Sequence, residues 1–144
     1  MNDFIISDVL DKQITALVIA MGSNHNANSS FTIALTALCE LGHVRCSSVV
    51  VGRDFTGRTS DEYHNACAVL NLDHPQSVDD IHGQLKHIER LCGRELGGSS
   101  VPMDLDILAV FDGTDWLVSQ KRLPFKAHER AGLSEVATFL LEIK

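Results

Sequence analysis

Two aspartates one residue apart are the side chains of this chain best suited to binding a metal. Asp104 and Asp106 begin an apolar run that extends to Phe111 and has the composition of a buried strand. Because side chains alternate across a strand, both carboxylates should project from the same face. Such carboxylates repel each other unless a cation lies between them, and magnesium prefers carboxylate oxygen and often binds nucleotide phosphates as well. The alternative is coincidence, since a chain this acidic contains about two or three acid-x-acid pairs by chance.

The composition is that of one globular domain spanning residues 1–144. The chain is long enough to bury a core, 44% of its residues are hydrophobic and 22% are charged, and it has no repeat or linker. A net charge of -7 argues against a general nucleic-acid-binding protein, which needs clustered lysine and arginine. An anionic nucleotide would therefore need local basic groups or metal ions.

The cysteines and the N-terminus both indicate a cytoplasmic protein. The four cysteines are scattered and form no CxxC pair, which predicts reduced core residues: Cys39, Cys46, Cys67 and Cys92. Residues 1–13 carry three aspartates and lack the basic start and apolar stretch of a signal peptide. Since no segment is long enough to span a bilayer, we expect no membrane partner.

Apolar runs predict the strands that would carry the aspartates. The expected strands cover residues 14–21, 44–51, 63–72, 104–111 and 116–118. Gly22 and Asn24 follow the first strand, where a tight turn would favour residues that tolerate positive backbone angles.

Helical spacing of apolar residues predicts three helices between and after these strands. The first is capped by Asn28, Ser29 or Ser30 and ends at Gly42, the second runs from a capping box of Ser77 and Asp80 to Gly93, and the third covers residues 134–143. The order strand, helix, strand, strand, helix, strand predicts an α+β fold, namely a ferredoxin-like sandwich of the split βαβ type with an antiparallel sheet.

Five short motifs occur in an order and spacing typical of one enzyme family. They are Gly22-Ser23-Asn24, Tyr63-His64-Asn65-Ala66, Ile88-Glu89 with Gly93-Arg94, Asp104-Leu105-Asp106-Ile107, and His128-Glu129-Arg130-Ala131. Together they resemble the 6-hydroxymethyl-7,8-dihydropterin pyrophosphokinase family over residues 15–135. The resemblance implies a step of folate biosynthesis in which the pterin hydroxymethyl oxygen attacks the β-phosphorus of ATP and AMP leaves. It also implies two Mg²⁺ ions as cofactors, with ATP and a pterin as the small-molecule partners.

The resemblance assigns a role to each matched residue. Asp104 and Asp106 match the metal-binding pair and, with Arg94, form the implied catalytic group. Tyr63 and Asn65 match the pterin-binding strand, and their spacing puts them on one face. An asparagine in an apolar strand is unfavourable to bury unless its amide is satisfied, and a heterocycle with donors and acceptors would satisfy it.

A second group of matched residues would contact the nucleotide or the pterin. Glu89 and Arg94 match a nucleotide-site pair, Lys121 and Arg122 would add positive charge for ATP, and Arg130 matches an arginine of the C-terminal loop that meets phosphate or pterin. The alternatives are structural: Glu89 with Lys86 as a solvated helix pair, Arg94 at a helix C-terminus, and ordinary surface charges for the others.

Three departures from the family pattern leave the reaction open. Residues 52–58 do not resemble the usual pterin loop, residues 98–102 lack an arginine that contacts ATP, and Ala131 and Gly132 stand where an aromatic residue stacks on the pterin. The chain could therefore be a working pyrophosphokinase, a related kinase acting on a different pterin-like alcohol, or a non-catalytic paralogue that binds a pterin or a nucleotide.

Overall fold

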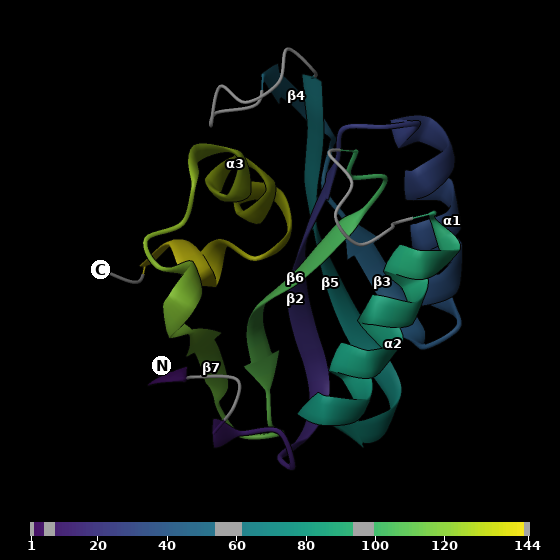
Figure 1. Ribbon diagram of the computed structural model, residues 1–144. Helices are drawn as coiled ribbons and strands as arrows, with labels where there is room; N and C mark the ends of the chain where they lie inside the picture. Colours follow the sequence, from purple (N-terminus) through teal and green to yellow (C-terminus); the bar gives the residue numbers. More distant parts are fainter. Residues whose placement is uncertain (1, 5–7, 54–61, 94–99, 143–144) are drawn as a thin grey trace.

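The fold is a mixed sheet with helices on both faces (Figure 1). The computed structural model describes residues 2–4, 8–53, 62–93 and 100–142. Its strands are β1 (Asn2–Phe4), β2 (Gln13–Ser23), β3 (Gly42–Cys46), β4 (Val50–Arg53), β5 (Glu62–Ser77), β6 (Asp104–Phe111) and β7 (Trp116–Ser119). Its helices are α1 (Ala27–Cys39), α2 (Val78–Leu91) and α3 (Ala127–Val136), with short 3-10 helices at Gln120–Arg122 and Thr138–Glu142.

The strand order confirms the predicted α+β ferredoxin-like sheet. Among the described residues the order is β1-β7-β6-β2-β5-β3, and β4 also pairs with β5. The strand β2 lies at the centre and pairs antiparallel with both β5 and β6. The helices α1 and α2 cover one face of the sheet, and α3 covers the other (Figure 1).

Each face of the sheet has its own apolar core. The larger core lies under α1 and α2 and includes Leu17, Ile19 and Leu85, whose exposed fractions are 1% or less. The smaller core lies under α3 and includes Val18 and Leu133. Neighbours along β2 thus belong to opposite cores, as side-chain alternation requires. This explains why residues 16–21 of the strand are apolar without interruption.

The first helix begins earlier than predicted, and Gly42 has a different role. The N-terminal cap of α1 is Asn26, which has a left-handed backbone with φ of 49°. The helix ends at Cys39 with Glu40 as its C-terminal cap, and Gly42 is the first residue of β3. A methyl group at Gly42 would collide with the backbone carbonyl of Asn71, so the close approach of two strands requires this glycine.

The strand expected over residues 44–51 is divided in two. The strands β3 and β4 are separated at Ser47, whose backbone N–H donates to Cys67 O and whose Oγ accepts from Cys67 N. Because a side chain takes over a bond of the ladder at this point, the regular pairing stops and resumes three residues later.

The second helix confirms its predicted start and stop. Ser77 is the N-terminal cap, and its Oγ accepts a hydrogen bond from Asp80 N at 3.1 Å. At the other end, Gly93 has a φ of 96°, the left-handed conformation that favours glycine after a helix.

The C-terminal helix predicted over residues 134–143 is wrong. The helix α3 starts at Ala127, because Lys126 N donates to the buried Glu129 carboxylate at 2.8 Å and fixes the first turn there. A 3-10 helix follows after a break at Ala137. The matched motif from His128 to Arg130 therefore lies in a helix and not in a loop.

The prediction that the cysteines are core residues is correct only for Cys67. Cys39 and Cys46 are exposed and Cys92 is half-buried. All four are free thiols.

The N-terminal segment contacts β7, the turn before it and the start of α2. Its strand β1 pairs parallel with β7, and Lys12 forms an ion pair with Asp112 at 3.3 Å. The carbonyls of Leu10 and Lys12 accept hydrogen bonds from Asp79 N and Val78 N in the first turn of α2. These N–H groups have no partner inside the helix, so the segment acts as an additional helix cap. In the described part of the chain, no helix is long and apolar enough to cross a membrane.

Candidate active site

Asp104, Gly22 and Asn65 form a row across three adjacent strands. Gly22 of β2 is paired with Asp104 of β6 on one side and with Asn65 of β5 on the other. Residues paired in this way project from the same face of a sheet. A methyl group added at Gly22 would lie 3.0 Å from Asn65 Oδ1. Gly22 therefore lies within a strand, not in the predicted turn, and its missing side chain keeps the space between Asn65 and Asp104 open.

Asp106 lies in the next row of the same face. Its neighbour Ala20 on β2 is paired with Cys67 on β5, and both belong to the core under α3. The two aspartates thus share one face, as predicted from their spacing. Arg122 reaches this face from the 3-10 helix after β7, and its Nη2 donates to Asp106 Oδ1 at 2.7 Å.

The negative charge of Asp106 is unfavourable even with Arg122 in contact. Burial is the largest cause and, together with the Asp104 carboxylate, raises the pKa of Asp106 to about 6, although Arg122 acts in the opposite direction. A hydrogen bond with Asp104 and the charge of Glu89 are smaller causes of the same rise. A group whose ionisation is opposed in this way gains from a nearby cation.

Glu89 is buried at the same end of β6. Its side chain is only 4% exposed, its Oε2 accepts from Leu105 N at 2.8 Å, and its Oε1 contacts Lys86 Nζ at 3.2 Å. The expected alternative pair of Glu89 with Lys86 is present, but its glutamate is buried and not solvated. Leu105 lies between the two aspartates in sequence, so Glu89 holds the backbone that carries them.

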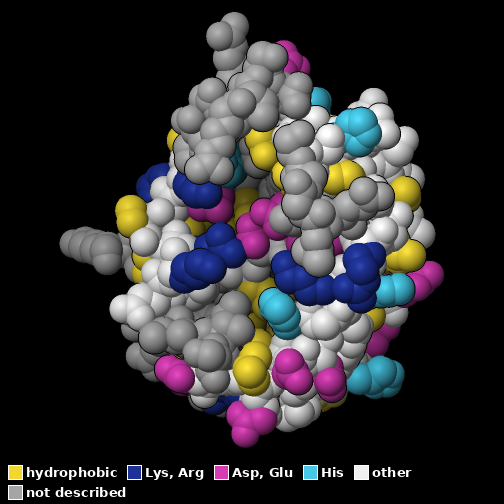
Figure 2. Space-filling view, viewed as in Figure 1, with side chains coloured by type: hydrophobic (Ala, Val, Ile, Leu, Met, Phe, Trp, Pro, Cys, Tyr) yellow, Lys and Arg dark blue, Asp and Glu magenta, His cyan; other side chains and the backbone are white. Residues whose placement is uncertain are grey.

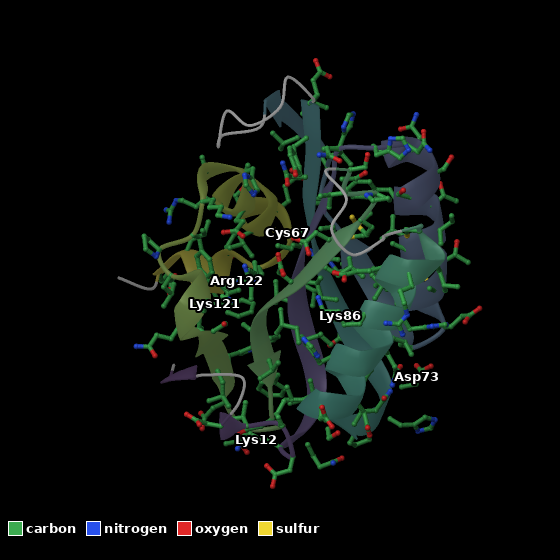
Figure 3. All side chains as sticks on the ribbon, in the orientation of Figure 1. Lys12, Cys67, Asp73, Lys86, Lys121 and Arg122 are labelled. Carbon is green, nitrogen blue, oxygen red and sulfur yellow. The ribbon has the colours of Figure 1, made fainter. Side chains whose placement is uncertain are left out.

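The sequence did not indicate Lys86 as a site residue. Lys86 and Arg122 are seen on opposite sides of β6 (Figure 3). Figure 2 shows acidic side chains in a hollow on the side of the molecule that is turned toward the viewer, with lysine and arginine side chains to either side of the hollow. The spacing of Lys86 three residues before Glu89 was the signal, but it is equally common on solvated helices.

The other predicted site residues are less tightly grouped. Tyr63 is half-buried in β5, two residues before Asn65 and paired with Gly52 of β4. Lys121 and Arg130 are exposed, the first beside Arg122 and the second on α3. Arg94 lies outside the residues that the structure describes.

The aspartate pair fits a magnesium ion that is completed by other ligands. In the ranges that the structure describes, no group of three His, Cys, Asp or Glu side chains is arranged to hold a metal. Magnesium, however, is usually bound through one or two carboxylates, with water and substrate phosphates as the remaining ligands. Asp104 and Asp106 supply that number of carboxylates on one face, and the charge of Asp104 is one of the causes that raise the pKa of Asp106, a repulsion that a bound cation would relieve.

Comparison with known proteins identifies the family of the chain. A search of curated proteins found no match. The family model described as 7,8-dihydro-6-hydroxymethylpterin-pyrophosphokinase (HPPK) matches residues 18–138, which is most of the chain and includes both aspartates and the Tyr63 and Asn65 pair. Members of this family are ATP- and magnesium-dependent enzymes that act on a pterin. The chain belongs to the 7,8-dihydro-6-hydroxymethylpterin-pyrophosphokinase (HPPK) family.

Proposed function

We propose that this protein transfers the pyrophosphoryl group of ATP to the hydroxymethyl oxygen of 6-hydroxymethyl-7,8-dihydropterin and releases AMP. The observation that carries the proposal is the row of Asp104, Gly22 and Asn65 across three strands. It puts a carboxylate suited to a metal next to an amide suited to a heterocycle, with only a glycine between them. Donor and acceptor substrates could therefore meet on one face of the sheet, in the cytoplasm, where we expect ATP to be available.

Asn65 and Tyr63 would bind the pterin. Both are half-buried on the same face of β5. The Asn65 amide offers both a donor and an acceptor to the polar edge of the ring, and Tyr63 offers an aromatic surface and a hydroxyl. Gly22 leaves the sheet surface flat beside Asn65, where a flat ring needs room.

Asp104 and Asp106 would hold two Mg²⁺ ions. When bound, these ions would neutralise the charge of the phosphates and make the β-phosphorus more electrophilic. Arg122 and Lys121 would add positive charge for the triphosphate, and Arg94 and Arg130 would contribute from their own segments. The main contribution of such residues is to position the substrates and balance their charge, which is how phosphoryl-transfer enzymes generally work.

Glu89 would serve the nucleotide site indirectly. Its carboxylate binds Leu105 N and Lys86 Nζ. The bond to Leu105 fixes the strand between the two aspartates, and the bond to Lys86 holds an ammonium group close to the site. We therefore assign to Glu89 a positioning role.

The choice of pterin depends on the contact between α3 and β5. A methyl group at Gly132 would lie 2.7 Å from Cys67 Sγ, so α3 packs directly against the sheet at this point. Ala131 and Gly132 provide no stacking surface. This observation keeps a second candidate open, a related kinase for a pterin-like alcohol with a different ring.

The test is AMP release from Mg-ATP with and without 6-hydroxymethyl-7,8-dihydropterin. We expect pterin-dependent AMP from the wild type and its loss in an Asp104→Asn, Asp106→Asn double variant. An Asp73→Asn variant is the control, because Asp73 is exposed and lies eight residues beyond Asn65 along β5. AMP release only with another pterin-like alcohol would favour the second candidate. A folded wild type that binds pterin or ATP but releases no AMP would favour a non-catalytic paralogue.

A further inference from the structure

We propose that Arg122 occupies the position of a cation at Asp106 in the metal-free protein. A divalent metal and Arg122 would then compete for the carboxylate of Asp106, and metal binding would free the guanidinium for an anionic ligand. This inference rests on the proposed metal-binding role of Asp104 and Asp106, and it adds a displacement step to it.

The contact between Arg122 and Asp106 is close and partly sheltered from water. The Nη2 to Oδ1 distance is 2.7 Å, and each side chain is only 24% exposed. A sheltered, charge-assisted contact of this length is stronger than an ion pair on the open surface. Arg122 is therefore a bound counter-ion of Asp106 and not a solvent-exposed surface charge.

The charges around Asp106 require such a counter-ion. Asp104 from the same strand and Glu89 from α2 both act on Asp106, and both are acidic. Lys86 of α2 is in contact with Glu89 at 3.2 Å. Arg122 is the cation in direct contact with Asp106 among the described residues.

Metal and guanidinium should disfavour each other at this carboxylate. A divalent ion bound to Asp106 would add two positive charges within a few ångströms of Arg122, and like charges at that distance repel strongly when partly buried. The ion also gives Asp106 the neutralisation that Arg122 provides without it. The attraction between the guanidinium and Asp106 is then weakened. The guanidinium becomes available to a phosphate, which it can bind with two parallel hydrogen bonds.

The backbone around Arg122 allows this movement without refolding. Arg122 ends a 3-10 helix that is held by the hydrogen bond from Leu123 N to Gln120 O. Ser119 before this helix is buried at 2% exposed, and Phe125 after it is 9% exposed. Since both flanks are anchored, the long side chain can leave Asp106 while its backbone stays in place.

The test measures Mn²⁺ binding in the absence of nucleotide, by the electron paramagnetic resonance signal of free Mn²⁺. We expect Arg122→Met to bind Mn²⁺ about five- to tenfold more tightly than the wild type, because the competing cation is gone. Lys121→Met is the matched control: it removes the same charge from the neighbouring residue, which is exposed, and should change the affinity less than about twofold. Arg122→Lys keeps a cation and should stay close to the wild type.

A second measurement uses Mg-ATP, followed by calorimetry. We expect Arg122→Met to bind Mg-ATP several-fold more weakly than the wild type, although it binds Mn²⁺ alone more tightly. Circular dichroism and thermal unfolding would show that each variant is folded. The opposite signs distinguish displacement of Arg122 from a general change in surface charge.

Three outcomes would overturn the inference. The first is that Arg122→Met and the wild type have the same affinity for Mn²⁺, or that neither binds it. The second is that Lys121→Met gains as much Mn²⁺ affinity as Arg122→Met. The third is that Arg122→Met binds Mg-ATP as tightly as the wild type. The AMP assay separates these from a failure of the proposed function. Pterin-dependent AMP from the wild type with no effect of Arg122→Met on Mn²⁺ would reject the competition alone, whereas absence of both AMP and Mn²⁺ binding would reject the metal site too.

Discussion

Glu89 Oε2 accepts a hydrogen bond from the backbone N–H of Leu105, 2.8 Å away, at the point of β6 that lies between the two aspartates. The strand β7 pairs only with residues 109–111, so among the described residues the first half of β6 has a strand partner only in β2. The buried carboxylate of Glu89 takes the place of the missing strand. It satisfies an N–H that would be unfavourable to leave unpaired.

We therefore expect Glu89→Ala to destabilise the protein by about 2 kcal/mol and to reduce AMP formation by at least tenfold. The alanine leaves Leu105 N without its acceptor and Lys86 without its ion-pair partner. Glu89→Gln should lose less stability and less AMP formation than Glu89→Ala, because its amide oxygen can still accept a hydrogen bond from Leu105 N. Urea unfolding and the AMP assay would measure the two effects, with the exposed Glu40→Ala as the control. Equal losses in the glutamine and alanine variants would mean that the negative charge matters and the hydrogen bond does not.

Local sequence rules predicted the strand that carries the site but not the burial of Glu89. Alternation along β6 was sufficient to place Asp104 and Asp106 on one face, and the capping box of Ser77 was sufficient to start α2. A lysine three residues before a glutamate has the same pattern on a buried and on a solvated helix. Among the described strands, β7 pairs only with residues 109–111 of β6, so the Leu105 N–H is left to the carboxylate of Glu89, which is a tertiary feature.

Two other differences have similar physical causes. Arg122 contacts Asp106 across sixteen residues of sequence, and no local pattern encodes such a pair. The apolar spacing of Val136, Phe139 and Leu140 matches one helix, but a short helix and a 3-10 turn produce the same spacing. In both cases the sequence indicates the residue type, and the packing of distant elements decides its place.

Gly22→Ala should impair pterin binding more than it impairs folding. The new methyl group would lie 3.0 Å from Asn65 Oδ1, so the amide must shift by a few tenths of an ångström. We expect the KM for the pterin to rise several-fold while the free energy of unfolding changes by less than about 1 kcal/mol. Steady-state kinetics and urea unfolding would measure these quantities.

Gly83→Ala is the matched control for that variant. A methyl group at Gly83, exposed on α2, meets nothing within 4 Å, so it should stabilise the helix by about 0.5–1 kcal/mol and leave the KM unchanged. A Gly22→Ala variant with wild-type KM would show that Asn65 does not contact the pterin or that the space beside it is not used.

The stability of the metal-free protein should fall as the pH rises from about 4 to 6. The pKa of Asp106 is raised from 3.8 to about 6 by burial and by Asp104, so the folded state holds the proton more tightly than the unfolded state. Below pH 4 both states are protonated and the group has no effect, and above pH 6 the folded state carries the full penalty. Asp106→Asn removes that penalty.

We expect Asp106→Asn to be more stable than the wild type by about 1–2 kcal/mol at pH 8 and to have a flatter pH profile between 4 and 6. Urea unfolding in the presence of a chelator would measure both effects, with the exposed Asp73→Asn as the charge-matched control. A variant that is less stable than the wild type at pH 8 would show that the ion pair with Arg122 outweighs the unfavourable burial of Asp106.

The thiol of Cys67 should resist alkylation in the folded protein. Burial is the main cause that raises its pKa to about 12, with a further contribution from Glu129, so almost no thiolate exists at pH 8. Its Sγ contacts the carbonyl of Glu129 at 3.5 Å, and Gly132 packs over it. Iodoacetamide should therefore modify the exposed Cys39 within minutes and modify Cys67 only in urea, as read by mass spectrometry of the digested protein. Equal modification of the two cysteines without urea would show that α3 separates from β5 in solution, which would also give a larger ring access to the face beside Asn65.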